Sequence, residues 1–166
     1  MINDAVTVRI AGRADATALA TLRIAWCAET SGAREDGFAE RFAAWLDRES
    51  GRRVNWLAER DGAPVGMLNL VVFERMPRPG VPDSRWGYVG NAFVLETHRN
   101  AGIGGELLSA AIEYARVEAF VRVVLSPSPR SVPFYRRYGF EVAEELLVLR
   151  LREGAGNPPV PAEART

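Results

Sequence analysis

Apolar and polar residues alternate in some stretches of the chain and follow a helical spacing in others. Alternation or a short β-rich run predicts six strands, over residues 7–10, 54–59, 65–73, 86–95, 121–125 and 140–151. Apolar residues three or four positions apart predict four helices, beginning near residues 15, 36, 103 and 130. The predicted order of elements is therefore β-α-α-β-β-β-α-β-α-β.

The connections indicate how these elements join. Asp61 and Gly62 are a strong hairpin signal, so the two strands beside them should be antiparallel. Residues 75–85 hold several prolines and should form a loop. The strand, helix and strand over residues 86–125 predict a right-handed βαβ unit with parallel strands. We expect an α/β fold with a central, twisted, mixed sheet and helices on both faces.

Length and composition are those of one globular domain. The chain has 166 residues, of which 48% are hydrophobic and 25% are charged. We expect a single domain over residues 1–153 and a disordered tail over residues 154–166, which is rich in proline. No secretory signal or membrane span is recognisable, and we expect a cytoplasmic protein.

The charged residues exclude several classes of function. The 21 basic and 21 acidic residues cancel, so neither a nucleic acid nor an anionic membrane is an expected partner. Every basic residue is arginine, which removes lysine nucleophiles from consideration. Cys27 is the single cysteine and His98 the single histidine, so we expect no disulfide and no metal site.

Three glycines within four positions follow the strand over residues 86–95. Residues 99–105 read Arg-Asn-Ala-Gly-Ile-Gly-Gly and lead into the helix from Ile103. Glycines let a main chain approach a bulky ligand, and the unpaired N–H groups and dipole of a helix N-terminus favour an anion. This loop is therefore the expected binding site for a phosphate.

Two motifs together resemble the GCN5-related N-acetyltransferases (GNAT). The first is Arg99-x-x-Gly102-x-Gly104, and the second is Pro133-Phe134-Tyr135-x-x-x-Gly139-Phe140. The dinucleotide fingerprint fits less well because it belongs to an early βαβ unit, and the NTPase phosphate loop needs a lysine. A nucleotide-binding α/β domain is another interpretation of the glycine loop, and such a domain would bind ATP or NAD but not coenzyme A.

The resemblance implies a GNAT-like fold with acetyl-CoA as co-substrate. Main-chain groups of the glycine loop would hold its diphosphate, and its pantetheine arm would lie along the preceding strand as an added strand. The implied cofactor-binding residues are Phe93, Val94, Leu95, Arg99, Asn100, Ala101, Gly102, Ile103, Gly104, Gly105, Ser128, Ser131 and Tyr135. Asn100 and Ala101 stand where many family members have Gly and Arg.

The resemblance also implies roles in catalysis. The main-chain N–H of Val94 would stabilise the oxyanion of a tetrahedral intermediate, and Tyr135 would protonate the departing thiolate, with Tyr138 as the fallback. An alkyl amine is protonated at neutral pH and must lose a proton before it attacks. Glu96 is the favoured proton acceptor, and the alternatives are Glu74, Glu29 and Asp36.

The implied function is transfer of an acetyl group from acetyl-CoA to a primary amine, directly and without an acyl-enzyme. The amine would belong to a small molecule or a peptide, and we consider a homodimer as the assembly. The alternative is a non-catalytic acyl-CoA-binding domain with a regulatory or interaction role. Release of thiol in the presence of amines would distinguish them, because a pure binding domain transfers nothing.

Overall fold

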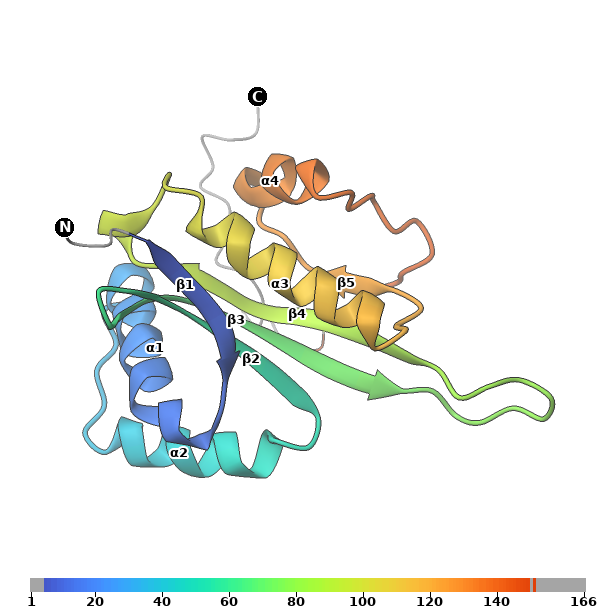
Figure 1. Ribbon diagram of the computed structural model, residues 1–166, viewed down its shortest axis with the longest axis horizontal. Helices are drawn as coiled ribbons and strands as arrows, with labels where there is room; N and C mark the ends of the chain where they lie inside the picture. Colours follow the sequence, from blue (N-terminus) through green and yellow to red (C-terminus); the bar gives the residue numbers. More distant parts are fainter. Residues whose placement is uncertain (1–4, 150, 152–166) are drawn as a thin grey trace. The chain divides into compact units, whose positions relative to one another are not determined.

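One mixed sheet carries the fold, with its strands in the order β1-β2-β3-β4-β5 (Figure 1). The computed structural model describes residues 5–149 and residue 151. The strands are β1 (Val6–Ala11), β2 (Arg53–Arg60), β3 (Ala63–Glu74), β4 (Arg85–Val94) and β5 (Val123–Leu125). Neighbours from β1 to β4 are antiparallel, and β5 runs parallel to β4. The expected mixed sheet is therefore confirmed.

The helices follow the predicted order. They are α1 (Ala16–Thr30), α2 (Phe38–Glu49), α3 (Ile103–Val117) and α4 (Val132–Arg137). The chain forms two compact units, Met1–Ser126 and Pro127–Thr166. The sheet and the first three helices belong to the first unit. No helix among the described residues has the length and apolar character needed to cross a bilayer.

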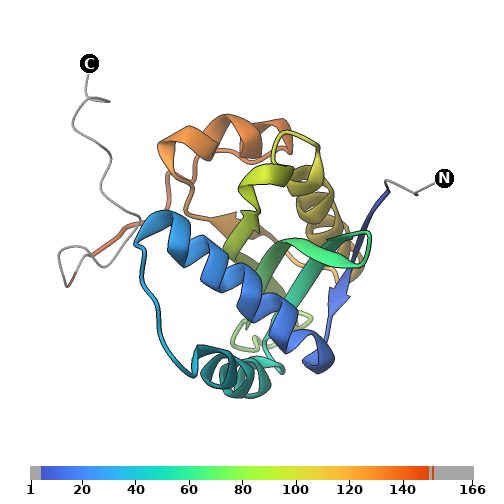
Figure 2. The same cartoon turned by 90° about the vertical axis from the view of Figure 1, so that its left-hand side faces the viewer.

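Helices cover both faces of the sheet, as expected. Leu57 of β2 and Met67 of β3 join the buried cluster formed with α1 and α2, and Figure 2 shows α1 in front of the sheet and α2 below α1. The neighbouring residue Trp56 points the other way and packs its ring edge-on against Tyr114 of α3, 5.5 Å between centroids. Successive side chains of a strand alternate between faces, so one strand supplies both cores.

The hairpin between β2 and β3 has the predicted turn. Arg60 pairs with Ala63 across it. Asp61 and Gly62 both have positive φ angles, 52° and 76°. Two consecutive residues with positive φ are typical of the type I′ turn, whose twist matches that of the flanking strands.

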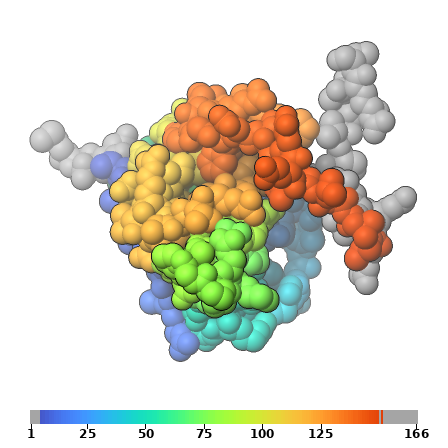
Figure 3. Space-filling view, turned by 90° about the vertical axis from the view of Figure 1, so that its right-hand side faces the viewer, coloured from blue at the N-terminus to red at the C-terminus, as the bar shows by residue number. Residues whose placement is uncertain are grey.

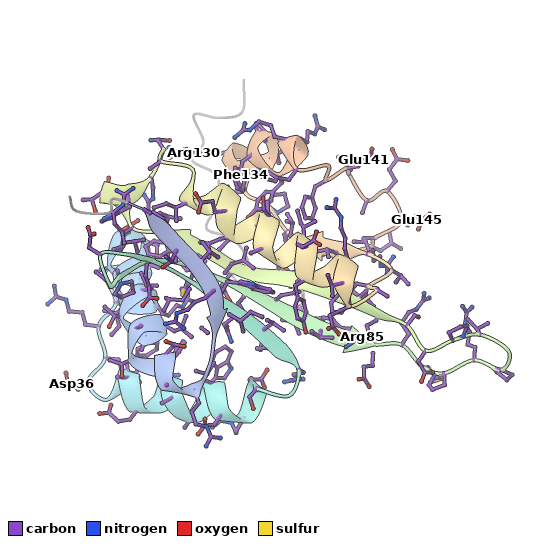
Figure 4. All side chains as sticks on the ribbon, viewed as in Figure 1. Asp36, Arg85, Arg130, Phe134, Glu141 and Glu145 are labelled. Carbon is purple, nitrogen blue, oxygen red and sulfur yellow. The ribbon has the colours of Figure 1, made fainter. Side chains whose placement is uncertain are left out.

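Close packing holds α3 against the sheet. A Cβ added to Gly66 of β3 would lie 3.1 Å from Leu107 Cδ1, so a larger residue there would require the side chain of Leu107 to shift. At the other end of α3, Arg85 donates to the carboxylate of Glu118 at 2.8 Å (Arg85 is labelled in Figure 4). The β3–β4 connection over residues 75–84 projects from the end of the sheet (Figure 1), and it faces the viewer in the end-on view of Figure 3.

The second unit contains α4 and a cluster of aromatic rings. Phe134 lies 5.1 Å from Tyr135 and 5.2 Å from Tyr138, between ring centroids. Gly139 follows the helix with a φ of 86°, the left-handed conformation expected at a helix C-terminus.

The predicted last strand, 140–151, is wrong for the residues that the structure describes. No strand is found over residues 140–149, and Leu147 and Leu149 are exposed. The segment has a β-rich composition, but a strand also needs a partner for its main-chain groups, and composition cannot supply that partner. The tail predicted over residues 154–166 lies outside the described residues.

Candidate active site

A gap opens between β4 and β5 in the first unit. The two strands pair only from Gly87 with Val123 to Val89 with Leu125. β4 continues to Val94, so its last five residues extend past the final pair. Parallel strands that separate in this way leave main-chain groups of β4 open to a ligand.

A bulge decides which main-chain groups face the gap. Asn69 of β3 is opposite Asn91, whereas Leu70 is opposite Val89, so Gly90 is an extra residue in β4. An extra residue reverses the alternation of main-chain direction along a strand. Residues that would otherwise bond to β3 therefore turn toward the gap.

Hydrogen bonds on either side of the bulge show this reversal. Before it, Gly87 donates to Arg122 on the β5 side at 3.0 Å. After it, Leu95 donates to Val65 of β3 at 2.9 Å. Because alternate residues point in opposite directions, the N–H groups of Ala92 and Val94 point to the side of the gap.

Of the three strand residues expected to hold the pantetheine arm, Val94 is the one whose amide faces the gap. The N–H of Leu95 is used by β3, and alternation directs Phe93 to β3 as well. Sequence reasoning missed Ala92, which shares the open edge with Val94. No signal within β4 identifies Ala92, because the direction of its amide depends on the bulge, which is a property of the register with β3.

The glycine loop lies directly after this strand. The short turn Glu96–His98 connects the strand to the loop, and the loop enters α3 through Gly102, whose φ is 83°. Glu106 makes the first hydrogen bond of α3, to Gly102 O at 3.1 Å. The N–H groups of residues 103–105 precede it and have no acceptor within the helix. This unpaired group of amides is suited to a phosphate.

Asn100 also has a left-handed conformation, with a φ of 61°. Asparagine tolerates this conformation better than other residues with a side chain. The replacement of a frequent family glycine by Asn100 is therefore compatible with the same loop path. Ala101 follows it and is exposed.

Arg99 connects the loop to α1 and β4. Its Nε donates to Val94 O at 2.9 Å, and its guanidinium pairs with Glu29 at the end of α1. The guanidinium also lies 5.6 Å from the ring centroid of Phe93. Arg99 therefore fixes the carbonyl of Val94 and the start of the loop, while the amides of residues 103–105 at the start of α3 remain available to an anion.

An aromatic stack borders the α1 side of this region. The rings of Trp26 and Phe93 are stacked at 5.4 Å, with 8° between their planes. Arg23 covers the outer face of Trp26 at 4.7 Å. Trp86 instead stacks on Phe73 at 4.3 Å, near the opposite end of β4.

The candidate proton acceptors lie in different places. Glu96 is exposed and directly follows the end of β4. Glu74 is opposite Arg85, at the start of β4, and the strand separates it from Val94 by about 30 Å. Asp36 is exposed in the segment before α2 (labelled in Figure 4).

The remaining predicted residues belong to the second unit. The hydroxyls of Ser128 and Ser131 lie 3.0 Å apart, and Ser131 donates to the carbonyl of Ser128. Tyr135 is half-buried, with its ring edge-on to Phe140 at 5.8 Å. Burial raises the pKa of the Tyr135 phenol above its ordinary value, because the charged form loses solvation. The phenol is thus protonated at neutral pH.

An open strand edge next to a helix N-terminus, whose first amides have no acceptor within the helix, is suited to a ligand that carries both amide groups and phosphates. The family model "Acetyltransferase (GNAT) family" matches residues 19–140. The chain belongs to this acetyltransferase family. This result confirms the resemblance and acetyl-CoA as the co-substrate.

Two curated relatives are similar over part of their length. The glucosamine 6-phosphate N-acetyltransferase of Trypanosoma brucei brucei is 30% identical over 90 residues, which are 54% of this chain and 59% of the relative. The uncharacterized N-acetyltransferase YjcF of Bacillus subtilis is 32% identical over 60 residues, 36% of this chain and 43% of the relative. The chain thus spans about half the length of the curated relatives that it matches.

Solved structures share the fold over almost their whole length. A predicted acetyltransferase from Clostridium acetobutylicum, crystallised with acetyl-CoA, has a TM-score of 0.72 and 21% identity, covering 89% of this chain and 97% of that one. A GCN5-related N-acetyltransferase from Ralstonia eutropha has a TM-score of 0.68 and 25% identity, covering 88% and 99%. The predicted fold class is confirmed.

Proposed function

We propose that the chain transfers the acetyl group of acetyl-CoA directly to a primary amine. The observation that carries this proposal is the open edge of β4, where the amides of Ala92 and Val94 face the gap beside the glycine loop. A bound acetyl-CoA supplies a thioester as the acetyl donor. The chain supplies binding, orientation and proton transfer.

The loop and the strand have separate binding roles. Amides at the start of α3, over residues 103–105, hold the diphosphate, with the helix dipole adding a favourable field. The edge at Ala92 and Val94 pairs with the amides of the pantetheine arm, in the manner of an added strand. Arg99 supports both roles, since it bonds to Val94 O and begins the loop.

The N–H of Val94 stabilises negative charge on the thioester oxygen during attack. Donors of this kind are effective because they are already oriented before the charge develops. Here the bulge at Gly90 orients the amide, and the bond from Arg99 to the carbonyl of Val94 holds the peptide group that follows it.

Proton transfers complete the reaction, because the ammonium group loses two protons: one passes to Glu96, and the other restores the phenol of Tyr135 after it has protonated the thiolate. Tyr135, which burial keeps protonated, donates to the departing thiolate. Glu96 receives the proton of the amine through water, because it is exposed at the carboxyl end of β4. Glu74 is not suited to this role, since it lies at the other end of the strand.

Attack on the thioester requires no acyl-enzyme. Cys27 is a free thiol on α1, outside the β4 edge and the glycine loop. Direct attack by the amine is therefore the simplest route. Release of thiol without an initial burst is the expected kinetic form, because no acyl-enzyme accumulates.

A screen for thiol release tests the proposal. The protein is incubated with acetyl-CoA and with polyamines, amino acids, aminoglycosides, amino sugars and peptide N-termini. Free thiol formed in proportion to acetylated amine supports transfer. Saturable acetyl-CoA binding with no thiol release for any amine would instead support the non-catalytic acyl-CoA-binding domain.

A further inference from the structure

Glu29 lies at an unfavourable position of α1 and contacts a residue far away in the chain. It belongs to the last turn of the helix, where the negative end of the helix dipole disfavours a carboxylate. Its side chain is 28% exposed and accepts from the guanidinium of Arg99, 70 positions later. Residues that break a local rule of helix stability are often placed for a functional reason. The contact with Arg99 supplies such a reason.

Arg99 joins Glu29 to the end of β4. Its Nε donates to Val94 O at 2.9 Å, its Nη2 donates to Glu29, and its guanidinium lies 5.6 Å from the ring centroid of Phe93. A guanidinium is planar and rigid, so two donors bound to two acceptors fix the position of the whole group. Glu29 thus holds Arg99 in the position from which it binds Val94 O.

The peptide group between Val94 and Leu95 is held at both ends. Its oxygen accepts from Arg99, and its N–H donates to Val65 O of β3 at 2.9 Å. The two ends of a trans peptide group point in opposite directions, so Val94 O points to the side of the gap. β4 and β5 pair only as far as Val89, and Arg99 therefore takes the place of the neighbouring strand at Val94.

The same side of α1 supports the rest of this strand end. Arg23, Trp26 and Glu29 follow one another at intervals of three, which places them along one side of the helix. Trp26 stacks on Phe93 at 5.4 Å, and Arg23 lies 4.7 Å from the ring centroid of Trp26. α1 thus contacts the end of β4 through two stacked rings and through the Glu29–Arg99 pair.

We propose that Glu29 is a positioning residue of the acetyl-transfer site. Through Arg99 it holds the end of β4 in the orientation that receives the pantetheine arm, and it neither touches the coenzyme nor accepts a proton. This role replaces the one considered for Glu29 from the sequence, that of an alternative proton acceptor. The proposal rests on the proposed function in one respect, because it takes the open edge of β4 as the binding site of the arm.

Two substitutions of Glu29 distinguish positioning from proton transfer. Glu29→Ala removes the contact with Arg99, whereas the carboxamide oxygen of Glu29→Gln has the same reach and can still accept from the guanidinium. A positioning residue should therefore tolerate glutamine and not alanine. A proton acceptor should tolerate neither, because a carboxamide is not a base at neutral pH.

Binding of two parts of the coenzyme locates the effect. Pantetheine carries the arm without the diphosphate, and ADP carries the diphosphate without the arm. In Glu29→Ala, the Kd values of acetyl-CoA and pantetheine, from calorimetry and displacement, should rise about threefold to tenfold, and the Kd of ADP should not rise. In Glu29→Gln, all three Kd values should stay within about twofold of the wild type.

Arg99→Ala tests whether Glu29 acts through the guanidinium. The double variant of Glu29→Ala and Arg99→Ala should bind pantetheine no more weakly than Arg99→Ala alone, because one contact depends on the other. With an amine accepted in the thiol-release screen, Glu29→Ala should raise the KM for acetyl-CoA, while kcat at saturation stays within about twofold of the wild type.

Glu118→Ala is the matched control. Glu118 follows α3 at its C-terminal end and pairs with Arg85 of β4 at 2.8 Å, and each side chain is 37% exposed. Arg85 begins β4 about 30 Å from Val94, so this pair lies at the opposite end of the strand. Both alanine variants should keep a Tm within about 3 °C of the wild type, and Glu118→Ala should leave every Kd unchanged.

The proposal is overturned if Glu29→Ala leaves the Kd of pantetheine unchanged, or if its effect adds fully to that of Arg99→Ala. It is also overturned if Glu29→Gln loses kcat as Glu29→Ala does, because Glu29 is then a proton acceptor. A wild type that binds acetyl-CoA but acetylates no amine would refute the proposed transfer, and the comparison of Kd values would still decide the role of Glu29.

Discussion

Replacing Gly102 by alanine separates the strain of the glycine loop from its role in binding. Gly102 has a φ of 83°, and a Cβ added to it would meet no atom within 4 Å. The cost to stability is therefore conformational rather than steric, about 1–2 kcal/mol for a residue with a side chain in the left-handed region. For a chain of this length, that predicts a fall in Tm of about 2–8 °C.

Coenzyme affinity should fall by more than the strain alone requires. If alanine relaxes φ, the amides after Gly102 change direction and lose a charge-assisted hydrogen bond to the diphosphate, worth about 1.5–3 kcal/mol. This corresponds to a Kd for acetyl-CoA about tenfold to 100-fold higher. Isothermal titration calorimetry measures the affinity, and thermal unfolding measures the strain.

Gly62→Ala is the matched control. Gly62 has a φ of 76° and open space around its Cβ position, but it lies in the β2–β3 turn. It should lose a similar amount of stability and bind acetyl-CoA as the wild type does. Equal losses of Tm with equal coenzyme affinity in both variants would refute the view that main-chain amides of the loop bind the diphosphate.

Further predictions concern catalysis, packing and pH. Tyr135→Phe should lower kcat about 100-fold or more, with the acetyl-CoA Kd unchanged, because the phenol is the proposed proton donor; equal kcat in a thiol-release assay would remove it from the mechanism. Gly87→Ala should cost about 1–3 kcal/mol in urea unfolding, because its Cβ would lie 2.8 Å from Cδ1 of the buried Leu70, whereas Gly51→Ala, with no atom within 4 Å, should be nearly neutral. Two arginines lower the pKa of Glu49 from 4.5 to about 2, so its carboxylate stabilises the fold above about pH 4.5 and loses this effect as pH falls toward 2. The Tm difference between wild type and Glu49→Gln should therefore shrink over that interval, and a difference that stays constant with pH would contradict this.

Local signals in the sequence predicted the features that depend on few residues. Asp61 and Gly62 specify their turn because few other residues accept two positive φ angles in succession. Gly102 likewise identifies the start of α3, because it too has a positive φ. Each of these predictions needs only the chemistry of adjacent residues.

Features that depend on a partner strand could not be predicted in this way. The bulge at Gly90 is a difference in register between β3 and β4, and nothing within β4 alone reveals it. The Asn55–Asn69 bond joins residues on different strands, so it was not visible as a polar pair. The run over residues 140–149 shows the opposite error, since its composition suggested a strand for which the described residues offer no partner.

Because of the extra residue at Gly90, the number of residues in β4 determines which of its main-chain amides face the gap, and the identity of the side chains has little effect on this direction. Substitution of Gly90 by any residue except proline leaves the direction of the Val94 amide unchanged. Single substitutions would therefore not reveal the role of the bulge. Removing one residue at the bulge would instead turn Phe93 outward and bury the Val94 amide in the ladder with β3. Proteins with this fold should therefore vary in the residue at this bulge more readily than in the number of residues in the strand.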